Sequence, residues 1–235
     1  MRQGGQILSR VFQIIKKEIK IGVTTKHLDQ VARKQIEKFR VKSSFLGYRG
    51  YPAALCCSVN DEVVHGIPSD RKLISGDIIG LDLGIKYQGW HVDRAETFAV
   101  GKINPIKQKL IKVTKEALEQ GISEAKEGNY VRDIARAIQK VAEEAGFSVI
   151  RDCTGHGVGR EVHEEPTIPN YDTGFSGPRL EVGMTLAIEP MICEKDYRIK
   201  TKLDNWTIAT IDQGNSAHFE ETVLVTRKGP EILTK

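Results

Sequence analysis

Carboxylates on apolar strands are the first residues of this chain that could do chemistry. Asp82 interrupts the apolar run Ile78–Leu83, and Glu189 follows a second apolar run, Met184–Ile188. An ionised carboxylate among apolar side chains is costly unless a cation pairs with it. Each acid therefore indicates a cation, although each one taken singly also fits the solvated end of a strand.

Asp93 lies eleven residues after Asp82 and offers a second carboxylate to the same place. If the chain turns at Tyr87–Gln88, the two acids fall opposite each other on neighbouring strands, with Cβ atoms about 4.5–5.5 Å apart. Two facing carboxylates repel, and a cation between them resolves the repulsion. A hairpin with both acids in solvent is the alternative interpretation.

The second half of the chain places an imidazole among glycines, in Gly155-His156-Gly157-Val158-Gly159, and His163 follows seven residues after His156. Glycines leave room for a metal ion or a substrate close to the backbone. The spacing is not the dinucleotide fingerprint, which reads Gly-x-Gly-x-x-Gly. A lone histidine is more often structural than a ligand, but two in one polar, glycine-rich stretch favour a site.

Glu220 and Glu221 precede another apolar strand, and we expect one of them to face inward and the other to face solvent. Taken together, the acids and one histidine form an oxygen-rich set suited to two divalent ions such as Mn, Fe(II), Co or Zn, rather than a sulfur-rich structural zinc site. The set consists of Asp82, Asp93, His156, Glu189 and Glu220. Four negative charges against two dications nearly cancel.

Helices and short strands must position these residues. Apolar spacing predicts helices over residues 6–19, from Thr24 or Thr25 to about Phe39, from Pro105 towards Gly128, and from Val131 to Gly146. Strands are predicted over residues 54–59, 78–83, 94–100, 184–188, 207–211 and 222–226. The order of two helices followed by strands occurs twice, which predicts two similar halves around one site. Both halves close with an acid, a threonine and an apolar strand, in 96–100 and 221–225.

Length and composition predict one compact α/β domain over residues 1–235, because 235 residues with 40% hydrophobic content can bury one substantial core. The first twenty residues are too charged for a signal peptide or a membrane span, and we expect a cytoplasmic monomer. The net charge of +4 is spread along the chain. The basic sets (Lys16-Lys17; Lys107, Lys109, Lys112, Lys115; Arg198, Lys200, Lys202) are expected to be solvated, with contact to ribosomal RNA as the alternative.

Cysteine usage gives no metal or disulfide signature. Cys56, Cys57, Cys153 and Cys193 form no Cys-x-x-Cys pair, and we expect free thiols. Cys56 and Cys57 are adjacent on a predicted strand and should point to opposite faces of it.

These motifs together resemble the methionine aminopeptidase family, in the bacterial short form without an N-terminal zinc-binding extension. The resemblance covers nearly the whole chain and is carried by residues 46–52, His65-Gly66-Ile67-Pro68, the Asp82 and Asp93 pair, residues 154–159, His163-Glu164-Glu165-Pro166, Ile188-Glu189-Pro190-Met191 and Phe219-Glu220-Glu221-Thr222.

The resemblance implies a pseudo-two-fold "pita-bread" α/β (α+β) fold, with an antiparallel sheet covered by helices. It implies that the five residues named above hold two metal ions, that Asp93 and Glu220 bridge them, and that a water made acidic by the ions is the nucleophile. Glu189 would shuttle its proton, and His65 and His163 would contact the substrate, with His163 near the scissile carbonyl. The methionine pocket would be lined or adjoined by Tyr48, Tyr51, Cys56 and Trp206.

The implied activity is removal of the initiator methionine from nascent polypeptides when the second residue is small. The sequence departs from the family pattern at Gly84, at Arg94, and at the pocket positions Phe45 and Val162, where Val162 replaces an aromatic residue. An Xaa-Pro aminopeptidase or prolidase shares the fold and ligands but usually carries an additional N-terminal domain, for which this chain has no room. A non-catalytic binding protein on the same fold is opposed by the complete ligand set.

Overall fold

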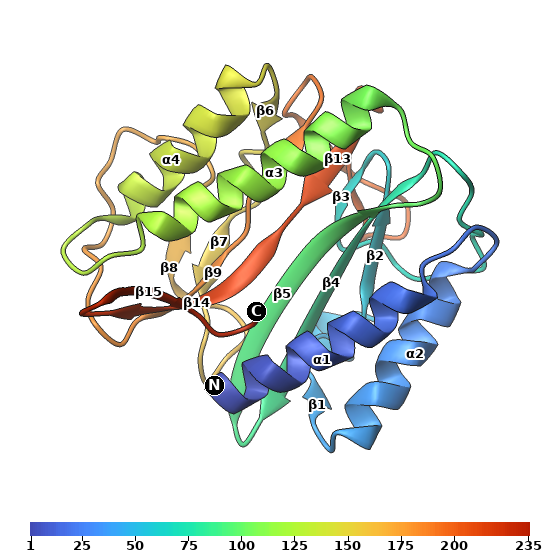
Figure 1. Ribbon diagram of the computed structural model, residues 1–235, viewed down its shortest axis with the longest axis horizontal. Coiled ribbons are helices and arrows are strands. Elements are labelled where there is room, and N and C mark those ends of the chain that lie inside the picture. The colour runs from blue at the N-terminus through green and yellow to red at the C-terminus, as the bar shows by residue number, and fades with distance from the viewer.

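The computed structural model describes residues 1–235, and all of its helices lie on one face of a large sheet (Figure 1). The helices are α1 (Arg2–Glu18), α2 (Thr25–Lys38), α3 (Pro105–Ser123) and α4 (Val131–Glu144). The side chain of Thr24 accepts a hydrogen bond from the backbone of His27 at 3.1 Å, and Asn104 caps α3 in the same way. The four predicted helices are confirmed, and α2 and α3 begin at their predicted caps.

Helix α1 begins four residues before the predicted start at residue 6. Gly4 and Gly5 concealed this turn because glycine is a poor helix former. A Cβ atom on Gly5 would lie 1.8 Å from the carbonyl oxygen of Leu233. The glycine is required there because the helix backbone packs directly against the C-terminal segment.

The sheet has nine antiparallel strands and runs without a break through both halves of the chain. Its main path is β1 (Lys42–Ser43), β4 (Ile78–Tyr87), β5 (Trp90–Ala99), β14 (Glu220–Thr226), β9 (Thr185–Ile188), β7 (Gly155–Gly157) and β8 (Glu164–Ile168). Strand β2 (Cys56–Val59) pairs with β4, and β15 (Gly229–Ile232) pairs with β14.

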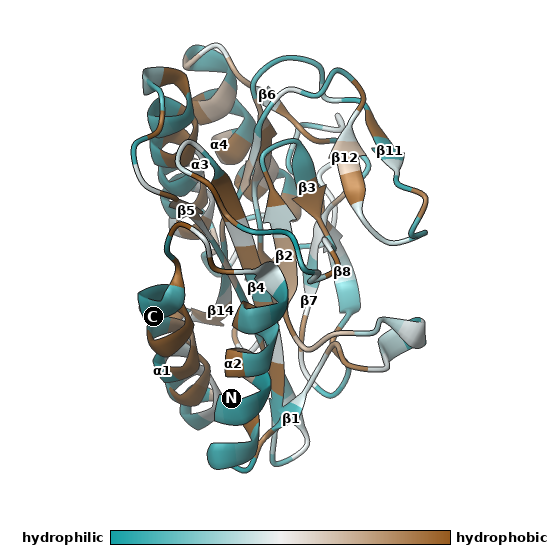
Figure 2. Ribbon diagram, turned by 90° about the vertical axis from the view of Figure 1, so that its right-hand side faces the viewer, coloured by the Kyte–Doolittle hydropathy of each residue, from teal (hydrophilic) through white to brown (hydrophobic).

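Two small sheets lie beside the main one. The first contains β13 (Ser216–His218), β10 (Met191–Cys193) and β6 (Ser148–Val149). The second contains β11 (Ile199–Thr201), β12 (Ile208–Thr210) and β3 (Glu62–Val64). Figure 2 shows β3, β11 and β12 on the side of the main sheet away from the four helices. A short 3-10 turn, η1 (Tyr48–Gly50), joins β1 to β2.

The register of the hairpin between β4 and β5 differs from the predicted one by a shift of the turn. Its two turn residues are Gln88 and Gly89, not Tyr87 and Gln88, and both have positive φ angles, 49° and 82°. This is the left-handed conformation that a two-residue type I′ hairpin requires. Asp82 therefore pairs with Ala95, and Asp93 pairs with Gly84. The two acids are diagonal neighbours on the same face rather than direct partners, which keeps them within reach of a shared cation.

A local two-fold symmetry relates the halves at the point where β5 meets β14. The Thr97 hydroxyl donates to the backbone oxygen of His218 and accepts from its N–H, both at 2.9 Å. The Thr222 hydroxyl makes the same two bonds to the backbone of Asp93, at 2.9 and 2.8 Å. Thr97 and Thr222 are the threonines of the two predicted matching segments, so that faint sequence repeat corresponds to a structural one.

Each half has its own apolar core between its helix pair and the sheet. Leu8, Phe12 and Leu28 of α1 and α2 belong to a cluster with strand β4, and Leu110 and Ile134 of α3 and α4 belong to a cluster with β9 and β14. The apolar stripes of the helices therefore serve core packing. No helix is long and apolar enough to cross a membrane.

Candidate metal centre

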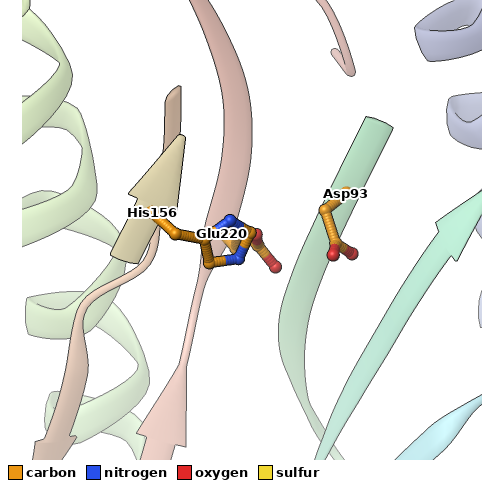
Figure 3. A group of neighbouring side chains, drawn as sticks. All are labelled: Asp93, His156 and Glu220. Atoms are coloured by element: carbon orange, nitrogen blue, oxygen red, sulfur yellow. The ribbon is translucent and has the colours of Figure 1, made fainter. Parts of the chain in front are cut away.

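Three predicted ligands meet on the helix-free side of the sheet, where β5 pairs with β14 and β7 lies beyond the intervening strand β9. Asp93, His156 and Glu220 point toward one another from these strands (Figure 3), and one ligand atom of each lies within 4.8 Å of the others. Asp93 is 3% exposed and Glu220 is 2% exposed. The alternative of a solvent-exposed hairpin is therefore wrong for Asp93.

Asp82 and Glu189 complete the set in the same cavity, which has a volume of about 380 Å³. Asp82 projects from β4, and Glu189 lies directly after β9. The Oε1 atom of Glu189 is 3.4 Å from Nε2 of His156. All five predicted ligands thus line one cavity, brought together from residues 82 to 220 of the chain.

The charge balance of this cavity calls for a cation. Burial raises the pKa of Asp93 to about 7 and raises the pKa values of Asp82, Glu189 and Glu220 well above their ordinary range, with mutual repulsion adding to the effect. The Oδ1 atom of Asp82 and the Oε1 atom of Glu220 are buried without a hydrogen-bond partner. Four carboxylates and one imidazole with unused buried oxygens fit divalent ions of the Mn, Fe, Co or Zn type.

His156 is held in the orientation that a metal ligand needs. Its Nδ1 atom is 2.8 Å from the carbonyl oxygen of Gly157, so Nδ1 carries the proton that this carbonyl accepts. Nε2 then presents a lone pair to the carboxylates. Burial lowers the pKa of His156 to about 4, which keeps the ring neutral and available as a ligand.

His163 and His65 line the same cavity, as predicted. The ring centroid of His163 lies 4.3 Å from that of His156, and its Nδ1 atom is 3.0 Å from the hydroxyl of Tyr48. His65 has a φ of 59°, a strained conformation for a residue with a side chain. Its side chain lines the cavity, and burial lowers its pKa to about 4.

Beyond the acids, the cavity continues into an apolar pocket. Its walls include Tyr51, Cys56 and Trp206, and the rings of Tyr51 and Trp206 meet edge to face at 5.1 Å. The Tyr51 hydroxyl donates to the carbonyl oxygen of Gly66 at 3.0 Å, which leaves the apolar ring face for the pocket. Phe45 belongs to the same cluster.

The cysteine predictions are confirmed. All four thiols are free, Cys56 faces the pocket, and Cys57 points to the opposite side, into the core of the first half. Burial raises the pKa of the Cys56 thiol, which is therefore a neutral wall of the pocket and not a nucleophile.

Two departures from the family pattern have structural explanations. A Cβ atom on Gly84 would lie 2.8 Å from Cβ of Ser44 and 2.9 Å from the ring of Phe45, so glycine allows that segment to pack on β4. Arg94 faces away from the cavity, and its guanidinium lies 3.4 Å from both Glu96 and Glu221.

The predicted solvent exposure of Glu221 is wrong, although Glu220 does face inward. Glu221 points to the other face of the sheet, where it contacts Arg94 and the Thr234 hydroxyl. The alternation of β14 was predicted correctly, but its outer face at Glu221 is covered by Arg94 of β5 and by the C-terminal residues.

Sequence reasoning missed His218 and Arg49. Nε2 of His218 lies 3.3 Å from Oε2 of Glu189, and Arg49 lines the cavity beside Tyr48. The signal for His218 was its position two residues before Glu220, because alternate residues of an extended chain share a face. Arg49 gave no signal, since its place depends on a left-handed turn with a φ of 48°.

Comparison with known proteins gives a consistent result. The sequence pattern of metallopeptidase family M24 matches residues 1–227. The chain is 47% identical to methionine aminopeptidase 1 of Bacillus subtilis, covering all of this chain and 95% of that protein, and 46% identical to the methionine aminopeptidase of Clostridium perfringens, covering 94% of it.

Solved structures agree in fold. The methionine aminopeptidase of Thermotoga maritima superposes with a TM-score of 0.97 at 45% identity and is covered to 95%. The Xaa-Pro dipeptidase of Bacillus anthracis gives a TM-score of 0.80 at 24% identity, and this chain spans 59% of it, which shows a shared fold only. The expected pita-bread fold is confirmed.

Proposed function

The chain belongs to metallopeptidase family M24, and from this premise we propose that it is a metal-dependent aminopeptidase that removes N-terminal methionine. One observation carries the proposal. The five ligand residues and an apolar pocket lie in the same cavity, so a methionine side chain in the pocket places its peptide bond beside the ligands.

We propose Asp82, Asp93, His156, Glu189 and Glu220 as the ligands of two divalent ions, with Asp93 and Glu220 shared between them. Two carboxylates from adjacent central strands suit bridging positions, because they lie between the remaining ligands of the two halves. The ions would lower the pKa of a water molecule and polarise the peptide carbonyl.

The surrounding residues supply positioning and proton transfer. Glu189 takes the proton of the attacking water and passes it to the leaving amine, a role that suits a carboxylate whose pKa is raised by burial. His163 is neutral, since burial and the nearby Arg49 lower its pKa, and its Nε2–H donates to the developing oxyanion. His65, which lines the same cavity, contacts the substrate.

The methionine side chain occupies the pocket formed by Tyr48, Tyr51, Cys56 and Trp206. The four side chains offer aromatic faces and a polarisable neutral thiol, which suit a thioether. The second substrate residue passes between the close-packed rings of His156 and His163 and the cavity wall. A small side chain is therefore required there.

The proposed substrates are the N-termini of nascent polypeptides in the cytoplasm, acted on by a monomer. Ribosome contact through the basic sets stays a prediction. Lys107 and Lys202 do not favour it, because Lys107 donates to Asn60 and to the Gly76 carbonyl, and Lys202 pairs with Glu62 at 2.8 Å.

Hydrolysis of Met-Ala-Ser, Met-Lys-Ser and Ala-Pro-Ser by the protein loaded with Mn or Co tests this function. We expect rapid cleavage of the first peptide only. Preferred cleavage of Ala-Pro-Ser would instead support the Xaa-Pro class, and equal rates for alanine and lysine at the second position would contradict the model of the narrow second subsite.

A further inference from the structure

His218 is a buried histidine in contact with Glu189, and none of the roles proposed above involves it. It lies at the end of β13 and is 3% exposed, and its Nε2 atom has no hydrogen-bond partner. A buried ring nitrogen without a partner costs free energy, so its retention beside the ligands calls for a reason.

The backbone of His218 is fixed by the symmetry of the two halves. Thr97 bonds both its N–H and its carbonyl oxygen at 2.9 Å, as Thr222 does for Asp93. His218 thus occupies in the second half the position that the ligand Asp93 occupies in the first. Its side chain reaches Glu189, which does line the cavity.

The contact partner of His218 is Glu189. Nε2 of His218 lies 3.3 Å from Oε2 of Glu189, whereas Nε2 of His156 lies 3.4 Å from Oε1. Each imidazole therefore faces a different oxygen of one carboxylate. A usual N–H···O bond is about 2.7–3.2 Å, so a shift of a few tenths of an ångström completes the bond to His218.

We propose that His218 is a positioning residue that donates its Nε2–H to Oε2 of Glu189 and thereby directs Oε1 toward the metal ligands. This inference rests on the proposed role of Glu189. An imidazole that carries its proton on Nε2 is a suitable donor to the carboxylate of Glu189, which lies 3.3 Å away. Residues that orient ligands in this way typically change metal affinity or activity about 10–100-fold when they are removed.

Two amide substitutions at His218 test whether a donor group must reach Glu189. In His218→Gln the amide nitrogen lies near the place of imidazole Nε2, whereas in His218→Asn the same group is too short to reach Glu189. Metal-free protein is titrated with Mn by calorimetry, and kcat and KM for Met-Ala-Ser are measured separately. Thermal melts of the metal-free variants show that both fold.

We expect His218→Gln to bind Mn within about threefold of the parent, and His218→Asn to bind it about tenfold more weakly. In His218→Asn, kcat should fall about 10–100-fold while KM changes little, because the pocket is untouched. His91→Asn, at a buried histidine whose ring contacts Ser44 outside the cavity, is the control and should bind Mn like the parent.

Equal Mn affinities of the two amide variants, whether both resemble the parent or both are weak, would overturn the inference. The titration uses no peptide, so its result is independent of substrate choice. If the parent fails to cleave Met-Ala-Ser while the two variants still differ in Mn affinity, the proposed function fails and the role of His218 stands.

Discussion

The carboxylate of Asp93 is repelled by the neighbouring carboxylates, and a single substitution can remove this repulsion. It is buried beside Asp82, Glu189 and Glu220, all of which repel its charge. Asp93→Asn removes one negative charge and keeps nearly the same shape. We therefore expect the free energy of unfolding of the metal-free variant to equal or exceed that of the parent. Its peptidase activity should be lost, because the carboxylate proposed to bridge the two ions is gone.

Thermal melts of both proteins, with and without metal, measure this effect. Added metal should raise the melting temperature of the parent much more than that of the variant. Asp93 accepts a hydrogen bond from the Arg94 N–H at 3.0 Å. If metal-free Asp93→Asn were clearly less stable than the parent, a further group would have to stabilise the negative charge of Asp93, which would contradict the expected repulsion.

The same carboxyl predicts how the stability of the metal-free protein depends on pH. Burial raises the pKa of Asp93 from 3.8 to about 7. Between these values the folded state binds more protons than the unfolded state, so the free energy of unfolding falls as pH rises from about 4 to 7. Asp82, Glu189 and Glu220 shift in the same direction and strengthen the trend.

Urea titrations at several pH values, with chelator present, measure this slope. The surface acids Asp172 and Asp196 have lowered pKa values, so their contribution to stability is lost only below the pH range of about 4 to 7 considered above. The decline should be shallower in Asp93→Asn. Stability that stays level or rises over this range in the metal-free parent would contradict the picture of a crowded acidic cavity.

At the scale of elements, Arg94 joins α1, β5, β14 and the C-terminal segment. Its guanidinium donates to the Thr234 carbonyl at 2.6 Å, lies over the ring of Phe12, and pairs with Glu96 and Glu221. Arg94→Ala leaves Glu221 buried without its cation. We expect a loss of about 3–5 kcal/mol in unfolding free energy, because breaking one partner of a buried pair exposes the desolvation cost of the other.

Urea denaturation measures the loss, and the double variant Arg94→Met, Glu221→Met is the matched control. It should recover most of the stability, since apolar replacements remove the uncompensated charge. The metal-bound activity of the folded fraction should change little, as Arg94 points away from the cavity. A single-variant loss below about 1 kcal/mol would place this pair among ordinary surface ion pairs.

The elements could be predicted from the sequence to different degrees. Helices were predicted well because apolar spacing and the caps Thr24 and Asn104 act locally. The start of α1 was missed because Gly5 is a poor helix former. A glycine is needed there only because the helix packs against Leu233, 228 positions further along the chain. The β4–β5 register was off because the turn depends on Gln88 adopting a positive φ, which glutamine seldom does.

The candidate site was predictable in its ligands and less so in its surroundings. An acid on an apolar strand or an imidazole between glycines is visible in the sequence, and all five such residues reach the cavity. The environment of Glu221 was not visible, because its partner Arg94 comes from another strand. The role of His218 was not visible for the same reason, since it depends on a contact with Glu189, which comes from another part of the chain.

At the scale of the molecule, the two halves act together through the strands β5 and β14. Asp82 and Asp93 come from the first half, and His156, Glu189 and Glu220 come from the second. Neither half alone holds a complete ligand set. Metal bound by residues of both halves should stabilise the folded state as a whole, by about 2.7 kcal/mol when free metal is 100-fold above Kd.

Hydrolysis of Met-Ala-Ser by rigorously metal-free protein, followed by titration with Mn or Co, tests the proposed metal dependence of the peptidase. We expect no turnover without metal and recovery as metal is added, because the cavity holds no strong nucleophile other than a water molecule activated by metal. Asp93→Asn should remain inactive throughout. Full peptidase activity in the metal-free protein, at a rate unchanged by added metal, would contradict this metal dependence.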